Sequence, residues 1–194
     1  IRPRDWSSDV CSSDLAVCVA RSGLAATTLE DVAREAGCSR ATLYRYASGK
    51  AQILGALAAR DGEAIVNALV AEAQFAPTLT DAVVAVVAGG VVALGRHPVL
   101  ARLLADEPDV LLPYLVFGGQ AAFLAVAAER LAPAFAATLP PADAARLAEW
   151  VVRMTISFLL CPSDRFDVAD AAQVRSAVDA FVVPGFLHRS EVHQ

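Results

Sequence analysis

Residues 27–50 read TTLEDVAREAGCSRATLYRYASGK, and this stretch decides the fold of the first part of the chain. Thr28 and Asp31 stand at the spacing of a capping box, which marks the start of a helix. The apolar residues that follow recur at helical spacing: Leu29, Val32, Ala33 and Ala36. Gly37 provides a position where a positive φ has no steric cost, and Ser39 is a favourable N-cap. The stretch therefore predicts a helix, a sharp turn and a second helix, with a third helix starting near Lys50.

The second of these helices has a surface that suits DNA. Leu43 is its one clear core residue, and the remaining positions carry Arg, Thr and Tyr: Arg40, Thr42, Tyr44, Arg45 and Tyr46. A short exposed helix of this composition, supported by a capped partner helix, can enter the major groove.

The string T-x-x-D-V-A-x-x-A-G-x-S-x-x-T-L-Y-R-Y-x-x-x-K, from Thr28 to Lys50, resembles the DNA-binding head of the TetR family of bacterial repressors. The resemblance covers about a quarter of the chain, roughly residues 15–60. It implies base contacts from Arg40, Ala41, Tyr44 and Arg45, and phosphate contacts from Thr28, Thr42, Tyr46 and Lys50. The sequence departs from the family pattern at Ala47, where an aromatic residue is usual.

Residues 5–15 read DWSSDVCSSDL, which is also a translation of a widely used short-read sequencing adapter. We interpret residues 1–15 as adapter-derived and expect residues 1–14 to lie outside the fold, with Trp6 unburied. TetR-like proteins open with a helix of several turns. On this interpretation only its last part remains, at about residues 16–21, ending near Gly23. The alternative is a genuine tail rich in serine and aspartate.

Charge is distributed unevenly along the chain. The net charge is −5, but residues 21–60 carry six basic and three acidic groups (+3), whereas residues 61–194 carry eight and fifteen (−7). A basic head joined to an acidic body is typical of a DNA-binding protein whose second domain does not touch DNA. We therefore expect a helix-turn-helix domain at residues 16–60 and a ligand-binding and dimerisation domain at residues 61–188.

The body of the chain shows helical spacing of apolar residues and no strand-like alternation, so the predicted class is all-α. Helices are expected at about residues 50–75, 80–96 with Thr80 as the cap, 98–104, 120–131, 142–160, and from 167 or 170 until Pro184. The longest nearly apolar run, residues 82–95, is too short to span a bilayer. We therefore expect a cytoplasmic protein without a membrane partner.

The helices expected at 142–160 and 170–183 are apolar over more than one face, notably at Val151, Phe158, Val174, Val178 and Phe181. In TetR-like proteins the last two long helices of each subunit form a four-helix dimer interface. The resemblance therefore implies a homodimer through these helices. The alternative is that both helices pack entirely inside the monomer.

A small-molecule pocket between helices of the body is the expected sensory site, because such pockets are mainly apolar with a few placed polar groups. The candidates are Leu104, Tyr114, Phe117, Phe123, Trp150, Arg153, Met154, Ser157 and Phe158, each of which is also plausible as plain core. No catalytic or nucleotide-binding motif is present, and the histidines and cysteines lack the spacing of metal ligands. We expect no enzymatic activity, cofactor or metal.

These observations favour a ligand-responsive dimeric repressor that binds a palindromic operator and is released by a small apolar or amphipathic effector. One alternative is a helical small-molecule-binding protein without DNA-regulatory activity. Another is an enzyme on a helical scaffold, against which the missing catalytic residues argue.

Overall fold

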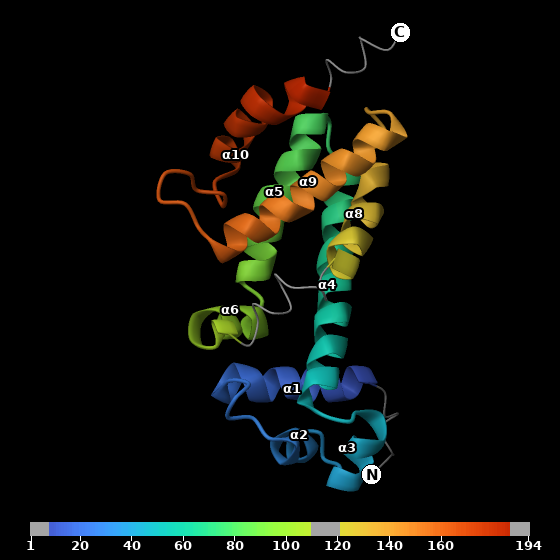
Figure 1. Cartoon of the computed structure of the whole chain (residues 1–194), viewed down its shortest axis with the longest axis vertical. Coiled ribbons are helices and arrows are strands. Elements are labelled where there is room, and N and C mark those ends of the chain that lie inside the picture. The colour runs from blue at the N-terminus through green and yellow to red at the C-terminus, as the bar shows by residue number, and fades with distance from the viewer. Residues whose placement is uncertain (1–7, 110–120, 187–194) are drawn as a thin grey trace. The chain divides into compact units, whose positions relative to one another are not determined.

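The structure is a computed structural model that describes residues 8–109 and 121–186. In these residues the all-α class is confirmed, with helices, turns and loops and no strand. The helices are α1 (Ser8–Ser22), α2 (Leu29–Glu35), α3 (Arg40–Tyr46), α4 (Lys50–Gln74), α5 (Leu79–Gly95), α6 (Pro98–Asp106), α8 (Ala121–Phe135), α9 (Pro141–Leu160) and α10 (Ala171–Ala177), continued by a π-helical turn, η1 (Val178–Val182) (Figure 1).

The chain divides into two compact units, which we describe separately. Unit 1 consists of residues 1–63 and 97–113, and unit 2 of residues 64–96 and 114–194. Unit 1 therefore contains α6, which the sequence-based division places in the second domain. In the described part of the chain, no single helix is both long and apolar enough to cross a membrane.

In unit 1, α1 packs against both α2 and α6, and α2 packs against α3 (Figure 1). Each helix of the unit contributes apolar side chains that are almost completely buried: Leu15, Val19, Val32, Leu43, Ile53, Leu57, Val99 and Leu103. Leu43, the predicted core residue of α3, is fully buried. The other positions of α3 are therefore available to face outward.

Local capping determines where α2 begins and ends and where α3 begins, as the sequence predicts. Thr28 and Asp31 form the capping box, and Ser39 Oγ accepts from the Thr42 backbone N–H at 3.1 Å. Gly37 has a φ of 68°, in the left-handed region. This conformation lets the Cys38 N–H reach the Ala33 carbonyl at 2.9 Å and close α2.

The N-terminal segment corrects one expectation. Helix α1 begins at Ser8 rather than near residue 16, and Ser12 and Asp14 are buried. The Ser13 hydroxyl also accepts a hydrogen bond from Arg60 at 2.6 Å. The expectation that residues 1–14 lie outside the fold is therefore wrong for residues 8–14, because a polar segment can extend an existing helix over its neighbours. Trp6 lies outside the described residues, and the adapter origin stays a prediction.

Helix α6 is tied to the rest of unit 1 at both ends. At its start, His97 Nε2 lies 2.9 Å from Asp61 Oδ2. Burial raises the Asp61 pKa, but hydrogen bonds from Arg60 and His97 outweigh it and leave the pKa lowered. At the other end, Glu107 Oε2 accepts from the Ala25 N–H at 2.7 Å, so α6 is held against the loop that follows α1.

In unit 2, α9 packs along α8 and α5, and α10 packs on α5 (Figure 1). The core that these helices enclose is built largely from Val, Leu and Ala, with Phe135 as its largest fully buried side chain. Gly90 of α5 lies so close to α9 that a Cβ at this position would come within 2.8 Å of the Thr155 methyl carbon. The two helices approach this closely because residue 90 has no side chain.

Three expected helix limits in unit 2 are wrong. Helix α5 is capped by Thr78, whose Oγ1 accepts from the Asp81 N–H, whereas Thr80 is buried and donates to Asp179. Helix α8 passes through Pro133 and ends at Phe135. The last helical segment continues past Pro184 to residue 186. The first limit follows from a local cap two residues earlier than expected, whereas in the other two cases the helix continues past a proline that was expected to end it.

Two glycines should respond oppositely to alanine. Gly55 lies on an exposed face of α4 with nothing within 4 Å of an added Cβ. We expect Gly55→Ala to raise the free energy of unfolding by about 0.5–1 kcal/mol through helix propensity. Gly90→Ala gains the same propensity but forces Thr155 aside, and overpacking costs about 1–3 kcal/mol. Chemical denaturation of both variants checks this, and a stabilised Gly90→Ala protein would contradict the close packing of α5 and α9.

Candidate nucleic-acid interface and body pocket

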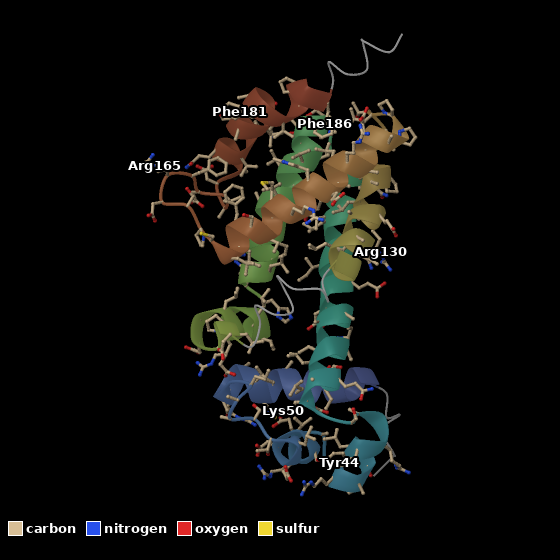
Figure 2. All side chains as sticks on the ribbon, viewed as in Figure 1. Tyr44, Lys50, Arg130, Arg165, Phe181 and Phe186 are labelled. Atoms are coloured by element: carbon tan, nitrogen blue, oxygen red, sulfur yellow. The ribbon has the colours of Figure 1, made fainter. Side chains whose placement is uncertain are left out.

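Helix α3 presents most of the side chains that the sequence assigns to DNA. Arg40, Ala41 and Arg45 are exposed, and Thr42 is half-buried. Tyr44, labelled in Figure 2, is 46% exposed. Tyr46 lies on the same helix, but its side chain is outside the described part of the structure. Burial of Leu43 on the opposite face explains this arrangement, because it fixes the rotation of α3 on the head.

Arg40 is already engaged within the head. Its guanidinium lies 2.6 Å from Glu30 Oε1 on α2, and its Cζ lies 5.8 Å from the centre of the Tyr44 ring. The contact with Tyr44 and the charge of Glu30 both raise the pKa of Arg40. The arginine is therefore held between an acid of the supporting helix and an aromatic ring of its own helix.

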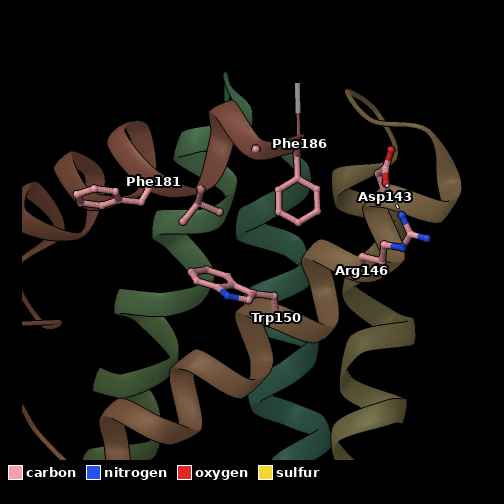
Figure 3. A pocket seen from close by; sticks show the side chains of 7 residues that line it. Asp143, Arg146, Trp150, Phe181 and Phe186 are labelled. Atoms are coloured by element: carbon pink, nitrogen blue, oxygen red, sulfur yellow. Dashed lines mark hydrogen bonds and ion pairs between the residues drawn. The ribbon is translucent and has the colours of Figure 1, made fainter. Parts of the chain in front are cut away.

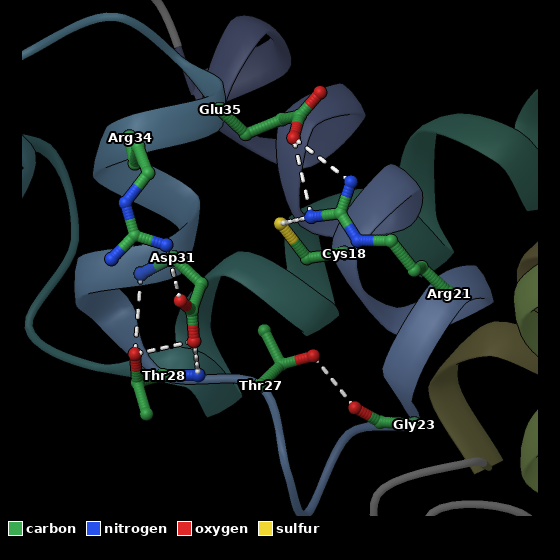
Figure 4. A network of polar contacts seen from close by, with 8 residues as sticks. All are labelled: Cys18, Arg21, Gly23, Thr27, Thr28, Asp31, Arg34 and Glu35. Atoms are coloured by element: carbon green, nitrogen blue, oxygen red, sulfur yellow. Dashed lines mark hydrogen bonds and ion pairs between the residues drawn. The ribbon is translucent and has the colours of Figure 1, made fainter.

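The other two acids of α2 also pair with arginines. Glu35 lies 3.3 Å from Arg21 of α1, and Asp31 lies 2.9 Å from Arg34 (Figure 4). Hydrogen bonds from Thr28 lower the Asp31 pKa, with a further contribution from Arg34. The three acids of α2 thus each oppose one arginine of the head. Among the described residues Arg45 forms no such ion pair.

Two of the residues predicted to hold phosphates are occupied by structural contacts. Lys50 Nζ donates to the carbonyls of Leu24 and Thr27 at 2.9 and 2.7 Å, which ties the start of α4 to the loop between α1 and α2. An ammonium has three N–H donors, so one remains for a phosphate. The Thr28 hydroxyl donates to Asp31 at 2.6 Å and would have to exchange that partner to donate to DNA. Both phosphate roles stay predictions.

Unit 2 contains an open pocket of about 320 Å³ between α9 and the C-terminal helical segment. Trp150, Phe181 and Phe186 supply its aromatic surface, and the Asp143–Arg146 pair stands at one side (Figure 3). Val182 and Gly185 complete the lining.

The predicted effector residues do not converge on this pocket. Of those whose side chains are described, only Trp150 lines it. Arg153 forms an exposed ion pair with Glu149, Ser157 is exposed, and Met154 is half-buried. The Phe158 ring packs at a tilt against the Phe166 ring, with the ring centroids 5.5 Å apart. Leu104 is half-buried in unit 1. Tyr114 and Phe117, together with the Phe123 side chain, lie outside the described part of the structure.

The predicted dimer residues divide into two groups. Val151, Val174 and Val178 are buried in the core of unit 2, and Phe158 is partly buried against it. Treating them as spare apolar surface is therefore wrong, because α5 and the neighbouring helices already cover them. Phe181 remains 84% exposed. We call Trp150, Phe181 and Phe186 the aromatic face of unit 2.

Residues 16–57 match the family model described as bacterial regulatory proteins, tetR family. The chain is a TetR-type transcriptional regulator. It is 28% identical over 160 residues to an uncharacterized HTH-type transcriptional regulator of Mycobacterium tuberculosis, covering 80% of this chain and 73% of the relative. The same figures hold for the protein of that description in strain H37Rv.

Two solved structures show the same fold as this TetR-type regulator. One is the TetR family repressor AlkX from a Dietzia strain, implicated in biodegradation of n-alkanes, with a TM-score of 0.72 and 21% identity over 95% of this chain and 97% of AlkX. The other is a transcriptional regulator from Streptomyces coelicolor, with a TM-score of 0.61 and 17% identity over 88% of this chain and 94% of that one.

Several residues of this TetR-type regulator escaped the sequence analysis. Glu30 was missed because an exposed acid on α2 reads as an ordinary helix-surface residue. Asp143, Arg146 and Phe186 were missed as pocket residues, although the spacing of Asp143, Arg146 and Trp150 places all three on one face of a helix. The described residues hold no group of three or more His, Cys, Asp and Glu side chains that could bind a metal.

Proposed function

We propose that this regulator is a dimeric repressor that inserts α3 into the major groove of a palindromic operator and responds to a small effector. The exposed Arg and Tyr face of α3, fixed by the buried Leu43 and by caps at Thr28 and Ser39, carries the proposal. Base contacts are assigned to Arg40, Ala41, Tyr44 and Arg45, and phosphate contacts to Thr28, Thr42, Tyr46 and Lys50.

A second copy of the chain is proposed to cover the aromatic face of unit 2. Trp150 lies on α9 and is partly exposed, and Phe181 lies on the C-terminal segment and is exposed. The sequence assigns this region to the dimer. On this assignment Trp150 contributes to the subunit contact, and the open pocket beside it is closed by the partner. Aromatic residues of this kind are enriched at the centres of protein interfaces.

The effector is proposed to be small and apolar or amphipathic. The likeness to the repressor AlkX, which is implicated in biodegradation of n-alkanes, supports this chemistry. An effector must favour one arrangement of the two heads over another to release DNA. Within unit 1, α6 is tied to Asp61 of α4 and to Ala25 in the loop after α1, so a displacement of α6 would act on both of these positions.

Selection from a random pool of duplexes tests the proposed function. We expect inverted repeats whose half-site centres are separated by about 10–10.5 base pairs or a multiple, the spacing of successive major grooves on one side of the duplex. Binding should weaken steeply with salt. A protein that binds no duplex at low salt would instead favour a small-molecule-binding protein without DNA-regulatory activity.

Lys50→Ala and Arg45→Ala should separate two kinds of DNA contact. Lys50→Ala is expected to lower the salt slope of DNA binding by about one unit and to weaken binding to all DNA sequences alike. It should also destabilise the head by about 1–3 kcal/mol, because two charge-assisted hydrogen bonds are lost. Arg45→Ala should leave the stability of the head unchanged and alter the preference for DNA sequence. It should weaken binding to the preferred site by about 1–3 kcal/mol. Salt titrations and thermal unfolding measure both, and an unchanged slope for Lys50→Ala would refute its phosphate contact.

A further inference from the structure

The contact between Arg40 and Glu30 lies on the surface that is proposed to meet DNA. Arg40 is the first residue of α3, and the N-terminal residues of a recognition helix are those that contact base edges. Its guanidinium is held by the Glu30 carboxylate at 2.6 Å. Both side chains are substantially exposed, so solvent and DNA can reach the pair.

We propose that Glu30 is a specificity-determining residue, which competes with DNA for the Arg40 guanidinium. The inference rests on the proposed function, because it concerns how α3 reads a duplex. It assigns to Glu30 an effect opposite to that of a DNA contact. The carboxylate restrains binding to arbitrary sequences and leaves sites with a matching base favoured.

The restraint follows from the partners that Arg40 exchanges. In moving to a phosphate, the guanidinium trades one anionic acceptor for another and leaves the Glu30 charge unpaired beside a polyanion. In moving to a guanine, it leaves Glu30 equally unpaired but gains two parallel hydrogen bonds to O6 and N7, which only a matching base supplies and only in the register where the other base contacts of α3 also form. Non-specific binding is therefore penalised more than binding to a matching site.

The Tyr44 ring directs this exchange. It stands four residues after Arg40 on the same face of α3, and the guanidinium lies over it. The side chain can therefore leave Glu30 without leaving the surface of α3. Asp31 and Glu35 are engaged with Arg34 and Arg21 instead, so Glu30 is the acid of α2 that pairs with the recognition helix.

Charge-neutral substitutions in the full chain test the inference. We expect Glu30→Gln to raise affinity for a mixed-sequence 30-base-pair duplex by roughly 3–10-fold near 0.1 M salt and to steepen the salt slope by up to about one unit. Affinity for the site selected from the random pool should rise less, so the ratio of specific to non-specific affinity should fall. Glu35→Gln is the matched control, because it makes the same change in net charge but releases Arg21.

The double variant Glu30→Gln/Arg40→Gln separates competition for Arg40 from general repulsion of DNA. If Glu30 acts through Arg40, replacing Glu30 should raise affinity for the mixed-sequence duplex only slightly when Arg40 is already replaced. Thermal unfolding should be nearly unchanged in each variant, since exposed ion pairs contribute only about 0–1 kcal/mol.

Three results would overturn the proposal. First, Glu30→Gln could raise affinity for the mixed-sequence duplex no more than Glu35→Gln does. Second, the rise in affinity could be just as large when Arg40 is also replaced. Third, Glu30→Gln could weaken binding, which would make Glu30 a support for Arg40 rather than a competitor. These results require a parent protein that binds duplex DNA. A parent that binds none would reject the proposed function itself, and the inference with it.

Discussion

Val178→Glu is expected to destabilise the fold of unit 2 strongly, and not merely to weaken a subunit contact. Val178 is only 3% exposed and belongs to the core cluster that α5, α9 and α10 enclose. A carboxylate at this site is left without an ionic partner in an apolar environment, which costs several kcal/mol and forces protonation or unfolding. A loss of about 4 kcal/mol is a large part of the stability of a protein of this size and corresponds to a fall in Tm of about 10 °C or more.

Circular dichroism and thermal unfolding of the variant measure this effect. Ser176→Glu is the matched control, because it places the same charge two residues earlier on an exposed position of α10. The control should remain within about 0.5 kcal/mol of the parent. A Val178→Glu protein that is folded, with parental Tm, and monomeric would return Val178 to the subunit interface and contradict the packing of η1 on α5.

Phe181→Glu is expected to have the opposite outcome, with an intact fold and a weakened dimer. The ring is 84% exposed, so the protomer loses almost no packing when it is replaced. In a two-fold dimer each copy contributes the same residue, and the substitution therefore acts twice. An aromatic anchor at the centre of an interface commonly contributes about 2 kcal/mol or more, so the dimer dissociation constant should rise by at least about 30-fold.

Loss of the dimer should also weaken operator binding, because the second head is no longer tethered beside its half-site. Sedimentation at micromolar concentration measures the first effect, and binding to single and paired half-sites measures the second. Phe75→Glu is the control: Phe75 is 87% exposed, follows the last residue of α4, and is not among the residues that line the pocket beside the aromatic face. If Phe181→Glu sedimented as the parent does, the aromatic face would not be the dimer interface.

The DNA-binding head was predictable because its signals are local. Thr28 with Asp31, Gly37 and Ser39 each act on backbone groups within a few residues, so sequence order alone brings their partners together. The composition of α3 likewise required no knowledge of the rest of the chain. The pairing of Glu30 with Arg40 was not predictable, because it depends on how α2 and α3 cross, which burial of Val32 and Leu43 determines.

The last helical segment shows what sequence cannot decide. In an uninterrupted α-helix, Val174, Val178 and Phe181 would fall on one face, and the sequence treated them alike. The π-helical turn at Val178–Val182 is wider than an α-helical turn and shifts the register that follows. Val182 is consequently buried and Phe181 points outward.

The sequence by itself therefore determined the all-α class, the capped helix-turn-helix and the residue types that α3 exposes, since these depend on local spacing. Only the tertiary structure decided which valines form the core of unit 2, which aromatic rings remain exposed, and which acid holds Arg40. Those outcomes depend on contacts between residues distant in the chain, and a one-dimensional pattern of apolar residues does not specify which neighbour covers them.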